Sequence, residues 1–250
     1  MRNVLILGGT TEARVLAAQL AQRLDLAVTL SLAGRTSAPR PQEVTTRQGG
    51  FGGVEGLSEY LRVARIDLLI DATHPYAAKI SGNAKRAALS TGVPLLAICR
   101  PPWDAVPGDR WIEVDDAAEG VEKLGSTPRR VFVALGRRDL QFLVRAPQHC
   151  YLIRSVDPVD PRLAVPDARY ILARGPFYEE ADRELLRSER IDVVIAKNSG
   201  GAATYSKIAA ARALGIQVVI IRRPAACAGV ATVDEAMQWI EHHWGLDRGV

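Results

Sequence analysis

The sequence predicts an α/β protein made of two Rossmann-like domains, each a doubly wound parallel sheet, with an interdomain cleft for ligands. The first observation is that short apolar runs, such as residues 67–70, alternate with amphipathic helical patterns. Strands that are apolar on both faces form parallel sheets covered by helices on both sides. The second observation is that the two halves of the 250-residue chain resemble each other. We therefore expect one domain over residues 1–125 and another over residues 126–250, joined near Ser126-Thr127-Pro128.

Five short segments of the first half recur in the second half in the same order. Residues 4–8 match 131–136, residues 49–51 match 175–177, and residues 66–70 match 191–195; Arg100-Pro101 matches Arg223-Pro224, and residues 114–117 match 233–236. A shared order of this kind is typical of duplicated architecture. Strands of α/β proteins also resemble one another without duplication, and both interpretations give two similar halves.

The same patterns place the elements of each half in order. In the first half, apolar runs predict strands at 4–7, 27–32, 44–47, 67–70, 94–99 and 111–114. Helices are expected near 11–24, 57–64 and 77–90 and before residue 124; the first has the apolar stripe Ala13, Leu16, Ala17, Leu20 and Leu24. In the second half, strands are expected near 131–135, 151–155, 169–173, 192–196 and 217–221, and helices near 138–144, 178–189, 203–214 and 233–243.

The composition narrows the choice of partners. Lys and Arg number 32 against 28 Asp and Glu, and only five of the 32 are lysines. This excess of arginine indicates either codon usage or an anionic ligand bound by guanidinium groups. No basic tract is interleaved with aromatic residues, so nucleic acid is not an expected partner. No apolar run reaches the roughly 18 residues of a membrane span, so no membrane association is expected either.

The cysteines and the amino terminus favour a cytoplasmic protein without a metal site. Cys99, Cys150 and Cys227 are odd in number and far apart in apolar runs, so we expect buried free thiols in a reducing compartment. The chain leads from Met1 directly into a strand pattern, without a signal-peptide cleavage motif. No cluster of cysteines and histidines has metal-ligand spacing, so no metal is expected. The sequence leaves the oligomeric state open and is compatible with a monomer.

The segment Gly8-Gly9-Thr10-Thr11-Glu12-Ala13 is the first predicted ligand site. It follows the first strand and opens the first helix, which is the position of a dinucleotide-binding turn. Gly8 and Gly9 permit a tight turn, and Thr10 and Thr11 offer hydroxyl and backbone donors to a phosphate at the helix amino terminus. Glu12 is expected to cap its own helix. A structural turn without a ligand is the alternative interpretation.

Arg35 decides which dinucleotide we expect. The end of the second strand carries an acidic residue in NAD-binding proteins, whereas an arginine there accepts the 2′-phosphate of NADP. This sequence has Arg35 followed by Thr36 and Ser37, with no acid, and therefore favours NADPH over NADH. An exposed arginine in a polar loop is the alternative. Gly50, in the glycine-rich turn at 49–53, lets the backbone approach a ligand closely, although a plain flexible loop explains these glycines equally well.

The ends of the fourth strands are expected to carry the reaction. In the first half, Thr73, His74 and Tyr76 follow the strand at 67–70, beside the expected nicotinamide. We expect Thr73 to bind the cofactor and His74 and Tyr76 to fix the ring or supply a proton. A histidine in the core is the alternative for His74.

The second half differs from the first where ligands are expected. Arg137 and Arg138 stand where the first half has Gly9 and Thr10; they hinder a pyrophosphate but suit carboxylates. We expect an anionic substrate at this end of the second sheet, bound by Arg137, Arg138, Arg174, Lys197, Asn198, Ser199, Gly200 and Tyr205. Lys197 is also a candidate proton donor. A solvated surface is the alternative for each residue taken separately.

Three segments resemble the precorrin-6A reductases of cobalamin biosynthesis: residues 8–13, residues 71–77 and residues 197–201. The resemblance covers nearly the whole chain in length and in motif order. It implies NADPH-dependent reduction of one double bond of the precorrin-6A macrocycle, near ring D, giving precorrin-6B. It also implies a polycarboxylate tetrapyrrole substrate and no metal or flavin cofactor. By the same resemblance, the glycine-threonine turn and Arg35 would bind the cofactor, His74 and Tyr76 would line the reaction cleft, and Lys197, Asn198 and Ser199 would contact the substrate.

Two other classes of protein remain alternatives at this point. A two-domain glycosyltransferase also closes two doubly wound halves around a nucleotide, but it is usually longer. A regulator that senses NADP without turnover would keep the fold and lose the reaction. The sequence does not distinguish a metal-free substrate from one containing cobalt.

Overall fold

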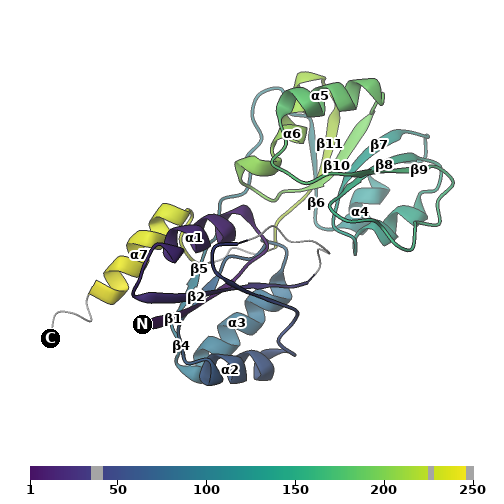
Figure 1. The fold of residues 1–250 in the computed structure, drawn as a ribbon. Helices are drawn as coiled ribbons and strands as arrows, with labels where there is room; N and C mark the ends of the chain where they lie inside the picture. Colours follow the sequence, from purple (N-terminus) through teal and green to yellow (C-terminus); the bar gives the residue numbers. More distant parts are fainter. Residues whose placement is uncertain (35–41, 225–227, 246–250) are drawn as a thin grey trace. The chain divides into compact units, whose positions relative to one another are not determined.

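The computed structural model describes residues 1–34, 42–224 and 228–245 (Figure 1). The first sheet consists of β1 (Arg2–Leu7), β2 (Leu26–Leu32), β3 (Thr45–Gln48), β4 (Ile66–Asp71) and β5 (Leu95–Ala97). The second consists of β6 (Trp111–Val114), β7 (Arg130–Ala134), β8 (Cys150–Ser155), β9 (Ala168–Leu172), β10 (Val193–Lys197) and β11 (Gln217–Ile221). All pairs of neighbouring strands are parallel. The predicted α/β class with two parallel-sheet domains is confirmed.

The helices that cover the sheets also follow the predicted order. They are α1 (Thr11–Ala21), α2 (Val54–Val63), α3 (Ala78–Thr91), α4 (Ala117–Glu122), α5 (Glu179–Ser188), α6 (Ser206–Ala213) and α7 (Val233–Gly245). Two predicted helices differ. The segment expected at 138–144 is a short 3₁₀ helix, η1 (Leu140–Arg145), and it ends before Ala146 because Pro147 disfavours helical backbone in the residue before it. The one expected at 203–214 divides into the 3₁₀ turn η2 (Ala202–Thr204) and α6.

The strand orders confirm that the two halves share one architecture. The first sheet has the order β3-β2-β1-β4-β5. The second repeats it as β9-β8-β7-β10-β11 and adds β6 beside β11. In the first sheet the strand order reverses between β1 and β4, and in the second it reverses between β7 and β10. Ligands of such sheets bind beyond the carboxyl ends of the strands at this reversal.

The division of the chain into units differs from the predicted boundary at residue 125. One compact unit contains Met1–Pro101 and Pro224–Val250, and the other contains Pro102–Arg223. The two halves have exchanged their last segments. β6 and α4 follow the first half in sequence but belong to the second unit, where β6 pairs with β11. Conversely, α7 follows the second half but packs against α1 in the first unit, and Val230 bridges to Ile98.

The exchanged segments also correct the fifth predicted sequence match. Val114 pairs with Ile221 beside β11, and Val230 pairs with Ile98 beside β5, so Val114 corresponds to Val230 and not to Val233. The helix caps agree with this register. Asp116 accepts a hydrogen bond from the Glu119 backbone, and Thr232 accepts one from the Glu235 backbone. Each glutamate reaches back to a backbone N–H before its helix, so both helices begin with a capping box.

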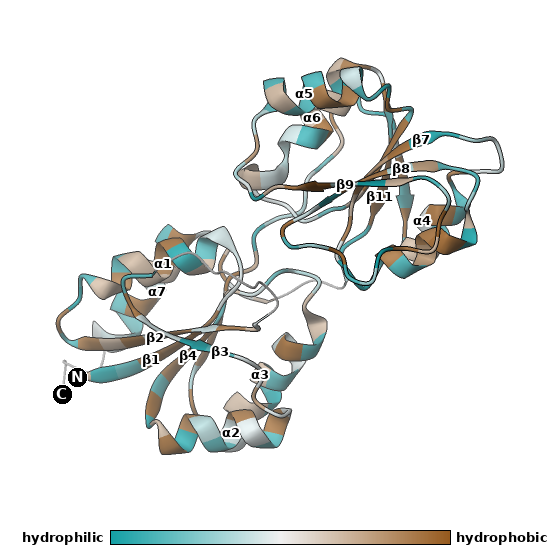
Figure 2. Ribbon diagram, turned by 45° about the vertical axis from the view of Figure 1, so that its right-hand side comes forward, coloured by the Kyte–Doolittle hydropathy of each residue, from teal (hydrophilic) through white to brown (hydrophobic). Residues whose placement is uncertain are grey.

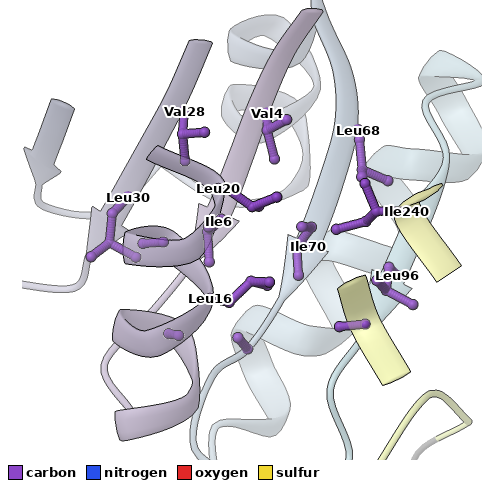
Figure 3. Packing of buried hydrophobic residues seen from close by; sticks show 14 of the residues in the cluster. Val4, Ile6, Leu16, Leu20, Val28, Leu30, Leu68, Ile70, Leu96 and Ile240 are labelled. Atoms are coloured by element: carbon purple, nitrogen blue, oxygen red, sulfur yellow. The ribbon is translucent and has the colours of Figure 1, made fainter. Parts of the chain in front are cut away.

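The core of the first unit shows how α7 belongs to it. One apolar cluster lies between the sheet and the helices α1 and α7, and Figure 3 shows Ile240 of α7 packed near Leu68 and Leu96. A second cluster lies between the opposite face of the sheet and the helices α2 and α3. The strands are apolar through the middle of each sheet, whereas the helices have one hydrophilic face (Figure 2). Burial on both faces explains why the central strands are continuous apolar runs.

The cysteines differ in part from the prediction. Cys150 is a free thiol of intermediate exposure, so it is not buried. Cys99 forms a disulfide bond, and the prediction of a free thiol is wrong there. Cys227 lies outside the described residues. Within the part of the chain that the structure describes, no helix is long and apolar enough to cross a membrane, and no group of His, Cys, Asp and Glu could hold a metal ion.

Candidate functional site

The predicted dinucleotide turn of the first unit lies between β1 and α1. A Cβ atom on Gly8 would come within 2.6 Å of the end of the Leu30 side chain, so a larger residue here would force Leu30 to shift. Gly9 has a φ of +115°, which also favours glycine, and a Cβ there would meet nothing within 4 Å. Thr10 caps α1: its hydroxyl accepts from the Ala13 backbone at 3.1 Å and donates to the Ala72 carbonyl at 2.7 Å. The turn is therefore fixed to the end of β4, and Thr11 begins the helix.

The sequence suggested that Glu12 caps its own helix, and this prediction is wrong. Thr10 is the cap, and the Glu12 carboxylate forms an ion pair with Arg100 at 2.5 Å. Both side chains are largely buried, with exposed fractions of 23% for Glu12 and 15% for Arg100. Arg100 was not predicted as a site residue. Its only signal in the sequence is the recurrence of Arg-Pro at residues 223–224.

The end of β4 brings Thr73 to the same place. Asp71 is buried, and its Oδ1 accepts hydrogen bonds from the Thr73 backbone at 3.1 Å and the Thr73 hydroxyl at 2.7 Å. Thr10, Glu12, Thr73 and Arg100 line one small pocket together with Ala72, Pro75 and Ile98. Three predicted cofactor residues are therefore neighbours.

His74 and Tyr76 follow Thr73 and lie beside each other. Their ring centroids are 5.6 Å apart, and the Tyr76 backbone donates to His74 Nδ1 at 3.4 Å. Both side chains are partly exposed at the carboxyl end of the first sheet, so neither is a core residue. The alternative of a core histidine is thus wrong for His74.

The glycine-rich turn after β3 is held by Arg47, which sequence reasoning missed. Arg47 donates to the carbonyls of Gly49 and Gly50, each at 3.1 Å, and to the Ser31 hydroxyl at 2.9 Å. Its guanidinium also lies 3.8 Å from the centroid of the Phe51 ring. Gly50 is therefore part of a braced turn. Arg35, the residue predicted to select NADPH, lies outside the described residues.

In the second unit, the predicted cationic residues fall into two groups. Lys197 is half-buried at the end of β10 and forms an ion pair with Asp139 at 2.5 Å, which joins it to the turn after β7. Arg137 and Arg138, in that turn, and Arg174, after β9, are exposed. All four residues lie at the carboxyl end of the second sheet, as predicted.

Asn198 has a different environment from the one predicted for a substrate residue. Its amide oxygen accepts from the Trp103 backbone at 2.7 Å, and its amide nitrogen donates to the Trp103 carbonyl at 2.8 Å. Asn198 is buried and fixes the segment that enters the second unit. Ser199 directs its hydroxyl to the Lys197 carbonyl at 3.4 Å, and Gly200 has a φ of +66° that the turn requires.

Tyr205 contributes to an aromatic pocket beside this turn. The pocket has a volume of about 450 Å³ and is lined by Trp103, Phe177, Tyr178, Glu179, Gly201, Ala202, Tyr205, Ser206 and Ala209. The Tyr205 ring lies 5.5 Å from that of Trp103, and its hydroxyl accepts from Arg212 at 2.8 Å. Trp103 and Phe177 were not predicted as site residues. Trp103 donates to the carbonyl of Gly201, 98 positions later, and nothing in the local sequence indicates this contact.

Comparison with known proteins identifies the family. A model of the precorrin-6x reductases CbiJ/CobK matches residues 3–241. The chain belongs to the precorrin-6x reductase family. A precorrin-6A reductase from Sinorhizobium sp. is 56% identical over 241 residues, covering 96% of this chain and 92% of the relative. The precorrin-6A reductase of Rhodobacter capsulatus is 50% identical, and both chains are covered completely. A solved structure of CobK precorrin-6A reductase matches with a TM-score of 0.92 and 50% identity, covering 97% of each chain.

Membership of the precorrin-6x reductase family confirms the resemblance seen in the sequence and makes the protein an oxidoreductase. It excludes the glycosyltransferase alternative. The structural match extends over both units, so the family fold includes the exchanged segments β6-α4 and α7.

A buried lysine beside the aromatic pocket of this reductase gives a testable pH dependence. Lys207 donates to the Thr204 carbonyl at 2.5 Å and lies 4.9 Å from the Trp103 ring. Burial, and to a lesser extent the nearby Arg154, lower the pKa of Lys207 to about 7, while Asp182 opposes the shift. The unfolded chain therefore binds this proton more tightly than the folded protein does. Above pH 10.5 the amine is neutral in both states, and as the pH falls from 10.5 toward 7 protonation of the unfolded chain lowers the free energy of unfolding.

We therefore expect the free energy of unfolding to fall by about 1 kcal/mol between pH 9 and pH 8 through this group. Lys207→Met removes the group, so the variant should lose this part of the pH dependence in urea titrations at the two pH values. Lys123→Met, at the exposed end of α4, is the control and should keep it. Equal pH dependence in Lys207→Met and the native protein would contradict the assignment.

Proposed function

We propose that this protein uses NADPH to reduce one double bond of precorrin-6A, giving precorrin-6B in cobalamin biosynthesis. The observation that carries the proposal is the similarity to precorrin-6A reductases over nearly the whole chain, at 56% and 50% identity. The cobalt-precorrin-6A reductase of Priestia megaterium is only 27% identical, which favours the metal-free macrocycle as substrate. We also propose that the reaction takes place in the cytoplasm, where a soluble pyridine nucleotide is supplied.

The residues of the first unit fit NADPH. The turn at Gly8 and Gly9 precedes an α-helix of 11 residues, and its amino-terminal N–H groups favour an anion such as a diphosphate. A Cβ on Gly9 would meet nothing within 4 Å, so the backbone there is open to a ligand. Thr10, Glu12 and Thr73 line the pocket next to this turn, while Gly50 lies in the turn braced by Arg47. Arg35 would bind the 2′-phosphate.

The chemistry divides between cofactor and protein. When bound, NADPH supplies a hydride to a carbon of the macrocycle. Reduction of one double bond also needs one proton, and the protein has three side chains proposed to provide it: His74, Tyr76 and Lys197. His74 and Tyr76 extend from the end of β4, beside the pocket of Thr10 and Thr73, so they are placed to act near the cofactor. The main task of the chain is to hold both ligands in reacting geometry.

The residues of the second unit fit the acidic rim of the substrate. A precorrin carries carboxylates around an apolar ring, and guanidinium and ammonium groups bind carboxylates strongly. Arg137, Arg138 and Arg174 are exposed at the carboxyl end of the second sheet, and Lys197 is held there by Asp139. We propose that these four residues bind the carboxylates, while the first unit holds the cofactor.

Lys197 offers the most specific test of the substrate site. We expect Lys197→Ala to raise the KM for precorrin-6A by about tenfold, the loss of one charged hydrogen bond, without changing the Kd for NADPH. Steady-state kinetics and a separate NADPH titration measure the two constants. Lys123→Ala, which removes an exposed lysine of the same unit, should leave both constants unchanged. Weaker NADPH binding in Lys197→Ala would place Lys197 at the cofactor instead.

The proposed activity itself is tested with purified protein. Oxidation of NADPH, followed by its absorbance, should require added precorrin-6A and yield a product with two more hydrogen atoms by mass spectrometry. Cobalt-precorrin-6A, offered in parallel, should react more slowly. NADPH binding without oxidation in the presence of either macrocycle would instead identify a non-catalytic sensor.

A further inference from the structure

The chain passes between the two units at two places, and both carry the same dipeptide. The first passage lies between Pro101 and Pro102, and the second between Arg223 and Pro224. The two dipeptides occupy equivalent positions. Ile98, two residues before Arg100, pairs with Val230 of one exchanged segment, and Ile221, two residues before Arg223, pairs with Val114 of the other. We call Arg100 and Arg223 the crossover arginines.

Each crossover arginine contacts a ligand turn of its own unit. Arg100 Nη1 lies 2.5 Å from Glu12 Oε2, in the first turn of α1. Arg223 Nη2 donates to the Ser199 carbonyl at 2.9 Å, in the turn that follows Lys197. Both bonds are partly buried. The first arginine thus braces the turn assigned to the cofactor, and the second braces the turn assigned to the substrate.

The charge of Glu12 explains why the cofactor turn needs such a brace. A carboxylate in the first turn of a helix stabilises the helix, but it repels a diphosphate at the same helix end. Arg100 neutralises this carboxylate and directs it into the pocket shared with Thr10 and Thr73. Because 77% or more of each side chain is shielded from solvent, bulk water screens this pair less than an exposed one.

We propose that the crossover arginines are positioning residues: Arg100 prepares the cofactor turn through Glu12, and Arg223 prepares the substrate turn through Ser199. The inference rests on the proposed function for the identity of the two ligands. It adds that the turns are held in place from the two points where the chain passes between the units. Neither arginine needs to contact a reacting atom.

The test compares two single variants by their separate effects on the two ligands. Arg100→Ala should raise the Kd for NADPH about tenfold and leave the KM for precorrin-6A unchanged at saturating NADPH. Arg223→Ala should raise that KM and leave the Kd for NADPH unchanged. Arg222→Ala is the matched control, since Arg222 is exposed and pairs at the surface with Glu113 and Asp115. It should change neither constant.

A second substitution separates positioning from direct contact and from general destabilisation. If Arg100 acts by neutralising Glu12, the double variant Arg100→Ala/Glu12→Gln should recover most of the lost NADPH affinity. Failure to recover it, or equal losses for both ligands in Arg100→Ala, would overturn the inference. If the native protein binds NADPH and reduces precorrin-6A while both arginine variants behave like Arg222→Ala, the inference fails and the proposed function stands. If the native protein does not bind NADPH, the proposed function fails.

Discussion

Replacement of Asp182 by alanine should lower the free energy of unfolding by about 3–5 kcal/mol, because it leaves a buried guanidinium without its partner. Asp182 lies in α5 and forms an ion pair with Arg154 of β8; the side chains are only 3% and 9% exposed. The second carboxylate oxygen accepts from the Ser206 hydroxyl at 2.5 Å and from Arg154 Nη1 at 3.3 Å. The arginine also lies over the rings of Phe132 and Phe177, which shield it from solvent.

Two further variants show that the effect comes from the unpaired charge. Glu180→Ala removes an acidic residue of the same helix whose side chain is 78% exposed and which pairs with Arg183; this change should lower the free energy of unfolding far less than Asp182→Ala. The double variant Arg154→Met/Asp182→Leu replaces the buried pair by apolar groups and should be closer to the native protein than Asp182→Ala. Urea denaturation followed by circular dichroism measures all three. Similar losses for Asp182→Ala and Glu180→Ala would show that the pair is not effectively buried.

This cluster matters because it supports the unit that we propose binds the substrate. Ser206 begins α6, and the residues just before it form the aromatic pocket with Trp103 and Tyr205. Asp182 therefore joins β8, α5 and the start of α6 beneath that pocket. A variant that loosens the cluster should also weaken binding of the macrocycle.

Most of the secondary structure could be predicted from sequence, because it depends on local patterns. Continuous apolar runs identified the central strands of both sheets, and the repeated order of these runs indicated two similar halves. The edge strand β3 has the polar sequence Thr-Thr-Arg-Gln, so it was expected from its place in the order and not from an apolar run. The exchange of the last segments could not be predicted in this way. β6 and α4 carry the same apolar pattern whichever sheet they join, and only the pairing of Trp111 with Val218, far along the chain, decides it.

The candidate site was predictable where one segment holds all the necessary residues. Gly8, Gly9 and Thr10 lie in one turn whose place after a strand and before a helix is visible in the sequence. Two residues of the site were not predicted. Arg100 pairs with Glu12, which only folding brings close, and the role of Asp71 depends on its burial beside Thr73. Asn198 illustrates the opposite error. An amide in a glycine-rich turn suggests a ligand, but here both of its polar atoms bind the backbone of Trp103.

We propose that Arg35 selects NADPH over NADH; because this residue lies outside the described residues, the proposal is tested by substitution. We expect Arg35→Ala to weaken NADPH binding by about 1–3 kcal/mol, or roughly 5- to 150-fold, because the guanidinium would lose charged hydrogen bonds to the 2′-phosphate. NADH has no such phosphate, so its affinity should change little. Fluorescence titration of both nucleotides against native and variant protein measures the difference.

The control for this substitution is Arg62→Ala, which removes an exposed arginine from α2 of the same unit and should affect neither nucleotide. Equal losses for NADPH and NADH in Arg35→Ala would mean that the side chain supports the fold of the nucleotide site and does not select the phosphate. A selective loss would have a further consequence. Two arginines would then contribute to NADPH binding: Arg35 through the 2′-phosphate, and Arg100 through its ion pair with Glu12.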